Sequence, residues 1–154
     1  MRDKRFVAVH RGGPLTRENH QKLIRWAREC SEHVCALLEG DIDQRLVNAL
    51  HVAREWENGK ATVGDARHAS VGAHTAARES SNPVAVAIAR SIGHTVATAH
   101  MADHSIGGAL YALKAMELAG KSTAAEREWQ IQQLQQLPPE IVKLVLNTRK
   151  FIFT

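Results

Sequence analysis

The sequence is poor in aromatic residues and in cysteine. Only 5% of its 154 residues are Phe, Trp or Tyr, so a hydrophobic core must be built mainly from aliphatic side chains, with alanine prominent. The only cysteines, Cys30 and Cys35, would lie about 140° apart around a helix, which prevents them from pairing or sharing a metal. We therefore expect two reduced thiols in a cytoplasmic protein.

Long apolar runs and a strong excess of charge of one sign are also missing. No segment approaches the roughly 20 apolar residues that span a membrane, and the basic start MRDKRFVAVHRGGP lacks the apolar stretch of a signal peptide. Lys and Arg number 20 against 16 Asp and Glu, but the cations are scattered and many have an acidic neighbour. These features predict a cytoplasmic protein that binds neither membranes nor nucleic acid.

Apolar residues recur at helical spacing along almost the whole chain, and the breaks between these stretches carry helix caps. Thr62 and Asp65, and again Thr123 and Glu126, have the spacing of a capping box. The pattern predicts an all-α fold, a single compact bundle of about six to seven antiparallel helices that forms one domain over residues 1–154. The other expected caps are Thr16, Asp41 or Asp43, and Asn82 before Pro83, and the Pro138–Pro139 pair opens the last helix.

The two ends of the chain depart from this pattern. RFVAVH, residues 5–10, favours a short extended segment that stops at Gly12-Gly13-Pro14. The tail KFIFT, residues 150–154, is apolar. Three roles are open for it: docking on the core, pairing with RFVAVH, or forming a homodimer.

Histidines concentrate in the stretch HTVATAHMADHS, residues 94–105. If one helix ran through it, His100 and His104 would share a face, and an i, i+4 histidine pair is a zinc or iron ligand geometry. Asp103, His94 or His74 could supply a third ligand. The stretch therefore raises the hypothesis of a metal site formed by His100, Asp103 and His104.

The alternative is that the helix ends just before Asp103, because a lone carboxylate on its apolar face would be costly to bury. Asp103 or Ser105 then caps the next helix, and the ligand geometry is lost. In that case His94 and His100 are expected to hydrogen-bond across closely packed, alanine-rich helices.

A basic stripe is predicted on the helix that begins after Thr62. Arg67, His74 and Arg78 recur on the face opposite its alanines and could meet an acidic partner surface or substrate. The alternative is a solvated face, or ion pairs with Glu55 and Glu57. The candidate binding residues are Arg67, His74, Arg78 and His94.

Three segments carry a family resemblance: RFVAVHRGGPLT, NALHVAREWENGKATVGDARHAS and SIGHTVATAHMADHSIGGALYALKA. They resemble the Imm-5-like putative immunity proteins of bacteria, over roughly Asp3 to Arg149. The resemblance implies an all-helical cytosolic protein that binds a cognate toxin and blocks it. A rim containing Trp26 and Trp129 would suit such a contact, because tryptophan is enriched at binding hot spots.

Two functions remain in view. The first is toxin neutralisation by surface complementarity, with no catalysis and no cofactor. The second is a metal-dependent all-helical enzyme, a hydrolase or oxidase, that uses zinc or iron at His74, His100, Asp103 and His104. We favour the first because the sequence shows no complete ligand set, no phosphate loop and no nucleophile elbow.

Overall fold

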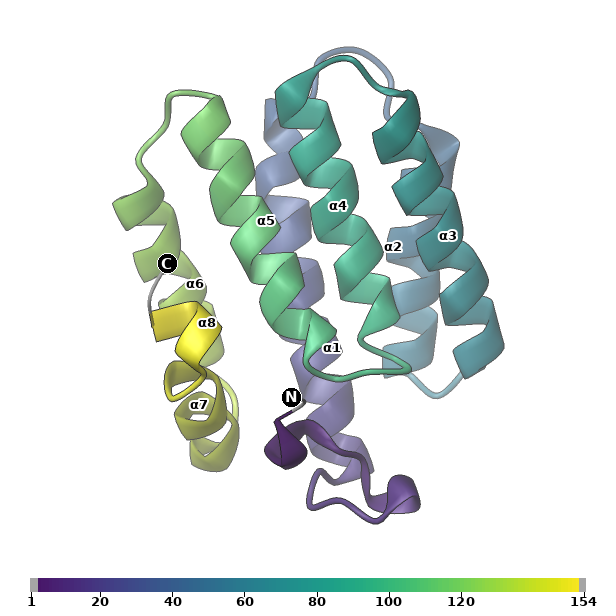
Figure 1. The fold of residues 1–154 in the computed structure, drawn as a ribbon, viewed down its shortest axis with the longest axis vertical. Helices are drawn as coiled ribbons and strands as arrows, with labels where there is room; N and C mark the ends of the chain where they lie inside the picture. The colour runs from purple at the N-terminus through teal and green to yellow at the C-terminus, as the bar shows by residue number, and fades with distance from the viewer. Residues whose placement is uncertain (1–2, 153–154) are drawn as a thin grey trace.

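The computed structural model describes residues 3–152, and its regular structure is helical throughout (Figure 1). The α-helices are α1 (Arg17–Val34), α2 (Gln44–Glu57), α3 (Val63–Glu79), α4 (Pro83–Ala97), α5 (His104–Leu118), α6 (Thr123–Leu134), α7 (Pro139–Leu146) and α8 (Arg149–Ile152). The short 3-10 turns are η1 (Lys4–Phe6), η2 (Val9–Arg11) and η3 (Cys35–Leu37). The all-α prediction is confirmed, and the single turn α8 is additional to the helices expected.

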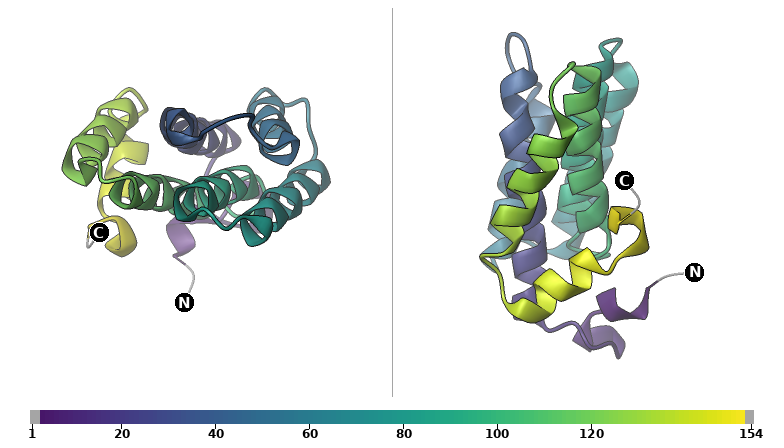
Figure 2. Two further views of the ribbon diagram at one scale, coloured as in Figure 1. Left: turned by 90° about the horizontal axis from the view of Figure 1, so that it is seen from above. Right: turned by 90° about the vertical axis from the view of Figure 1, so that its left-hand side faces the viewer.

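The helices are arranged in two layers (Figure 2). Seen from above, α3, α4 and α5 form one row, and α2, α1 and α6 form the other. Helix α4 lies in the middle of its row and packs against α3 and α5 on either side and against α1 and α2 behind it. The α3–α4–α5 row therefore presents one broad face outward (Figure 1).

Helix starts follow the predicted caps at most positions. The side chain of Thr16 accepts a hydrogen bond from Asn19 N, Asp43 caps α2, and Asn82 caps α4. Helix α3 opens with the complete capping box expected, in which Thr62 and Asp65 each accept from the other's backbone N–H. These local bonds satisfy the first amides of each helix and keep the connections short.

The predicted cap of α6 is wrong by one residue. Ser122, not Thr123, is the N-cap, and its hydroxyl accepts from Ala125 N at 3.1 Å. Glu126 makes no return bond to the cap, because its carboxylate is buried against His33 of α1. The contact of Glu126 with His33, which is distant in sequence, therefore replaces the return bond that the capping box required.

The amino-terminal segment RFVAVH is not extended as expected. It contains the end of η1 and the start of η2, and a single isolated bridge joins Ala8 to Leu15. Phe6 is nevertheless buried in the hydrophobic core. Gly12 has a left-handed φ of 83°, and Gly13 lies so close to the backbone of Val7 that a side chain would not fit. The two glycines close a tight turn, which leaves no room for a strand.

The apolar tail docks on the core as far as it is described. Phe151 is fully buried and packs edge-on against Trp26, with 5.9 Å between ring centroids. The guanidinium of Arg127 lies 4.3 Å from the centre of the Phe151 ring and donates to the Phe151 carbonyl. The last two residues of KFIFT lie outside the described range, and homodimer formation stays a prediction.

Alanines let the helices approach closely. Ala66, Ala69, Ala73 and Ala76 face inward from α3, as predicted, and α5 contributes a similar buried set. Between residues 3 and 152, no helix has the length and apolar character needed to cross a membrane.

Candidate functional site

Three neighbouring helices bring histidines together on the outward face. The ring of His94, on α4, lies 5.3 Å from that of His74 on α3 and 5.2 Å from that of His104 on α5, measured between centroids. His100, in the turn before α5, lies 5.4 Å from His104. Tyr111 of α5 stacks on His94 at 5.2 Å, with 13° between the ring planes. We call this group the histidine cluster.

Two glycines make room for these rings. A Cβ atom at Gly93 would lie 2.6 Å from Nε2 of His74, and one at Gly107 would lie 2.9 Å from Cγ of His94. Each imidazole thus fills a groove that a neighbouring helix leaves open. The sequence signal for this packing is the tripeptide Ser-Ile-Gly, which occurs at residues 91–93 and again at 105–107. Our sequence reasoning missed it.

The contacts of the cluster favour uncharged imidazoles. Arg90 lies with Nη1 2.7 Å from Nδ1 of His74, and because a guanidinium only donates, Nδ1 of His74 must accept. Burial lowers the pKa of His74, and the charge of Arg90 lowers it further. Burial and then the neighbouring His104 lower the pKa of His94 to about 4. At neutral pH both rings are therefore neutral, and Arg90 is the permanent charge beside them.

His94 and His104 also constrain each other. Their Nδ1 atoms are 3.0 Å apart, so one nitrogen donates and the other accepts. The ring whose Nδ1 accepts has no proton there and is neutral. His94 thus makes its hydrogen bond across the helices, as the alternative interpretation expected, and its partner is His104 of α5.

The helix does not continue through the histidine-rich stretch. Helix α4 ends at Ala97, so His100 and His104 lie on either side of a helix start and the i, i+4 pair does not form. Asp103 occupies the N-cap position of α5, but its side chain makes no capping bond, and its Oδ1 is buried without a hydrogen-bond partner. Across residues 3–152, no group of three or more His, Cys, Asp or Glu side chains is arranged to hold a metal ion.

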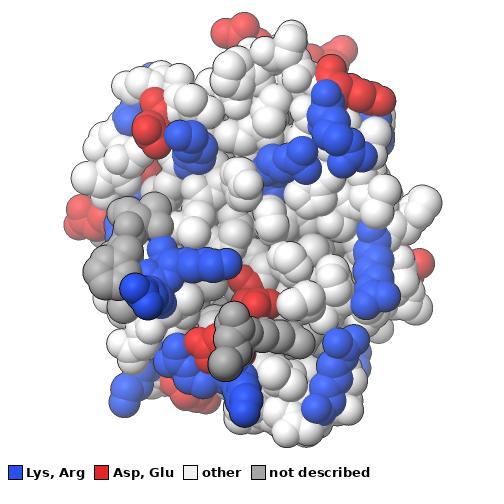
Figure 3. All heavy atoms as spheres, in the orientation of Figure 1, with Lys and Arg blue, Asp and Glu red and all other residues white. Residues whose placement is uncertain are grey.

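The predicted basic stripe lies beside the histidine cluster. Ser70 of α3 donates to the carbonyl of Gly93 on α4, which turns the side of α3 that carries His74 toward α4. Arg67 and Arg78 are exposed along this side. Figure 3 shows the outward face, with Lys and Arg side chains spread over it and acidic side chains near its middle and along its edges.

The acidic partners considered for this stripe are engaged elsewhere. Glu55 lies 3.8 Å from His51 on its own helix, and Glu57 accepts from Arg28 at 3.0 Å. Arg78 instead donates to the hydroxyl of Thr75 on α3. The stripe is therefore not neutralised by Glu55 or Glu57.

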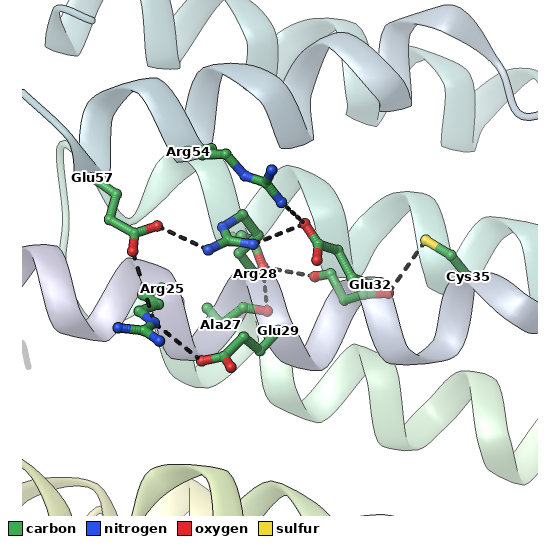
Figure 4. A network of polar contacts seen from close by, with 10 residues as sticks. Arg25, Ala27, Arg28, Glu29, Glu32, Cys35, Arg54 and Glu57 are labelled. Carbon is green, nitrogen blue, oxygen red and sulfur yellow. Dashed lines mark hydrogen bonds and ion pairs between the residues drawn. The ribbon is translucent and has the colours of Figure 1, made fainter. Parts of the chain in front are cut away.

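Charges on α1 and α2 are paired in a network (Figure 4). Arg28 of α1 forms two ion pairs: its guanidinium nitrogens lie 3.0 Å from a carboxylate oxygen of Glu32 and 3.0 Å from one of Glu57. Burial alone would lower the pKa of Arg28, but its hydrogen bonds to Glu32 and Glu57 outweigh that effect and raise it. Arg25 and Arg54 extend the network to the same carboxylates. This side of the molecule thus balances its own charge.

A second cluster joins α1 to α6. His33 lies 2.6 Å from the buried carboxylate of Glu126 and stacks on Trp129 at 3.6 Å between centroids. Cys30, on the same helix as His33, would complete a set of nucleophile, base and orienting acid. Its thiol is fully buried, however, and burial followed by the charge of Glu126 raises its pKa well above the ordinary value. As arranged, this thiol is protonated and out of reach of a substrate.

The two tryptophans do not form the exposed rim that was expected. Trp26 is fully buried and donates from Nε1 to the carbonyl of Gln130 at 2.9 Å, because α6 covers this side of α1. Trp129 is partly buried beneath His33.

Comparison with known families gives one finding on the chain as a whole. A protein-family model described as "Imm-5 like putative immunity protein" matches residues 13–137. The match runs from before α1 to beyond α6 and includes every residue of the histidine cluster and the basic stripe. No curated protein and no solved structure matches the chain.

Proposed function

The chain belongs to the Imm-5 like putative immunity protein family, and from this premise we propose that it binds a cognate toxin and neutralises it without chemistry of its own. The family match is the observation that carries the proposal. We place this action in the cytoplasm of the bacterium that makes both proteins. Blocking of this kind requires a surface that matches the toxin and keeps its shape.

The internal hydroxyl network supports a surface of fixed shape. Ser31 of α1 lies 2.8 Å from Ser91 and 2.7 Å from Thr95 of α4, measured between hydroxyl oxygens. Thr95 also donates to Ala27 of α1, and Ser91 donates to Gly108 of α5. These fully buried bonds hold α4 and α5 on α1, so the outward row of helices is fixed before any partner arrives.

Rescue of growth tests the proposal. A candidate toxin domain from a neighbouring gene is expressed from an inducible promoter, alone or together with the chain. We expect co-expression to restore growth and the two proteins to purify as a stable complex. The variant Ile92→Asp places a charge in the core and is expected to unfold the chain. Co-expression of this variant should therefore fail to restore growth, which controls for effects that do not need the folded protein. A folded, soluble wild-type chain that neither rescues growth nor binds the toxin would contradict the proposal.

A further inference from the structure

The outward surface of α3, α4 and α5 combines cations, neutral imidazoles and one exposed aromatic ring. We name it the histidine face. Its residues are Arg67, His74, Arg78, Arg90, His94, His104, Tyr111 and Lys114. We propose that the histidine face docks an acidic segment of a protein partner, whose Asp and Glu side chains bind its arginines. The inference rests on the proposed function and names the chemistry of the toxin surface.

The first argument is the charge of the three helices. Helix α4 contains no acidic residue, and α3 and α5 contain only Asp65, Glu79 and Glu117. Each of these carboxylates already has a partner. Asp65 accepts from the backbone of Thr62 at 2.9 Å, Glu79 lies 2.8 Å from Arg45 of α2, and Glu117 lies 3.6 Å from Lys114. Asp103, which directly precedes His104 at the start of α5, adds one further carboxylate, and its Oδ1 has no hydrogen-bond partner. Within residues 3–152, none of these four carboxylates forms an ion pair with Arg67, Arg78 or Arg90.

The contrast with the opposite layer strengthens this argument. On α1 and α2, Arg25, Arg28 and Arg54 are all matched by glutamates of the same two helices (Figure 4). The arginines of the histidine face have only neutral neighbours among their hydrogen-bond partners, Thr75 for Arg78 and His74 for Arg90. Because opposite charges across an interface steer and orient binding, a face of unmatched arginines fits an acidic partner.

The second argument is the way Arg90 is held. His74 accepts from Nη1 of Arg90, and the ring of His74 is itself fixed against Gly93. Arg90 is half-buried, so its stem is held while its guanidinium lies next to the cluster. A guanidinium has five N–H donors in a rigid fork that matches a carboxylate, and a fork oriented in advance loses less entropy on binding.

The third argument is the apolar surface beside these charges. Tyr111 is 37% exposed on α5, and Val71 is 62% exposed on α3, the helix that carries Arg67 and Arg78. Tyrosine and arginine are the residues that most often carry binding energy at the centre of an interface. Nucleic acid is a poorer match, because His74 and His94 are neutral at neutral pH and phosphate backbones require many permanent cations.

Peptide mapping tests the surface without the toxin. The full ¹⁵N-labelled chain is titrated with an oligoglutamate peptide at low salt, and an alternating Glu–Lys peptide of equal length is the control. We expect amide shifts concentrated on α3, α4 and α5 with oligoglutamate and much smaller shifts with the control. Shifts centred on α1 and α2 or on the amino-terminal turns would overturn the proposal. Tighter binding of a DNA duplex to the same face, at the same salt, would overturn it too.

Matched variants test the surface with the toxin. Arg67→Gln with Arg78→Gln removes two exposed charges of the face, and Arg25→Gln with Arg54→Gln removes two from the opposite layer. Calorimetry is expected to show toxin affinity lowered about fivefold or more by the first pair and less than about twofold by the second. Arg90→Gln, expected to be at least as damaging, adds a single-site measurement.

The outcomes separate the two proposals. If the wild-type chain binds toxin but both the Arg67/Arg78 pair and Arg90→Gln bind equally well, the histidine face is not the docking surface, and the proposed function stands. If oligoglutamate maps to the face but the chain neither binds nor neutralises the toxin, the proposed function is wrong, and the face still selects acidic protein segments. Unchanged circular dichroism of the variants shows that their folds are intact.

Discussion

Single glycines decide whether the histidine cluster can form. We predict that Gly93→Ala destabilises the protein by about 1–3 kcal/mol, because its Cβ would lie 2.6 Å from the His74 ring. Gly72→Ala on α3 is the matched control, since its Cβ would first meet Arg45 at an ordinary 3.8 Å. The control is expected to be neutral or stabilising by up to about 1 kcal/mol, as usual inside a helix. Urea unfolding measures both, and equal stability of the two variants would refute the close packing.

His94 links stability to pH at the same scale. Its pKa is about 4 in the folded protein against an ordinary 6.5, because burial and neighbouring cations disfavour the charged ring. Between these values the unfolded chain binds more protons, so stability is full above about 6.5 and falls as the pH drops toward 4. We expect His94→Gln to flatten this dependence in urea unfolding. A wild-type profile that rises as the pH falls through this range would contradict the prediction.

The first residues of α6 offer a direct test of which side chain caps a helix. Ser122 and Thr123 can both cap a helix by composition, but only Ser122 accepts from the backbone of α6. We predict that Ser122→Ala costs about 1 kcal/mol of unfolding free energy, and that Thr123→Ala, exposed and inside the helix, costs much less. Thermal unfolding of the two variants measures the difference. A larger loss for Thr123→Ala would mean that the predicted capping box is the one that forms.

The elements were largely predictable because their signals are local. Thr16, Thr62 and Asn82 cap helices through bonds to amides two or three residues ahead, and a sequence shows that spacing directly. The failures came from distant contacts. Glu126 left the expected capping box for His33, and the segment RFVAVH was folded into turns by Gly12 and Gly13.

Metal content is a property of the whole molecule. We predict that the purified chain carries no stoichiometric zinc, iron or manganese, because His100 and His104 are separated by a helix start and Asp103 belongs to neither helix body. Elemental analysis after purification without chelator measures this, and EDTA is expected to leave the unfolding transition unchanged. Stoichiometric metal, or an unfolding temperature lowered by EDTA, would contradict this prediction and favour the metal-dependent enzyme that the histidine-rich stretch suggested.

The candidate site shows the same division between near and distant contacts. Arg67, His74 and Arg78 were predictable as one stripe because a helix brings residues at these spacings to one side. Two contacts of the cluster were not predictable, because each joins two helices. They are the contact of His74 with Arg90 and that of His94 with His104. Trp26 was expected at the surface for the same reason: a single helix does not reveal that α6 will cover it.

The sequence alone determined the helices, most of their caps and the excess of basic residues, because these depend on neighbours within one or two turns. The tertiary structure decided which charges are matched. It joined Arg28 of α1 to Glu57 of α2 and Arg54 of α2 to Glu32 of α1, and it left the arginines of the histidine face beside neutral groups. The physical reason is that charge pairing depends on which helices pack side by side, and that packing is set by the alanines and glycines between them.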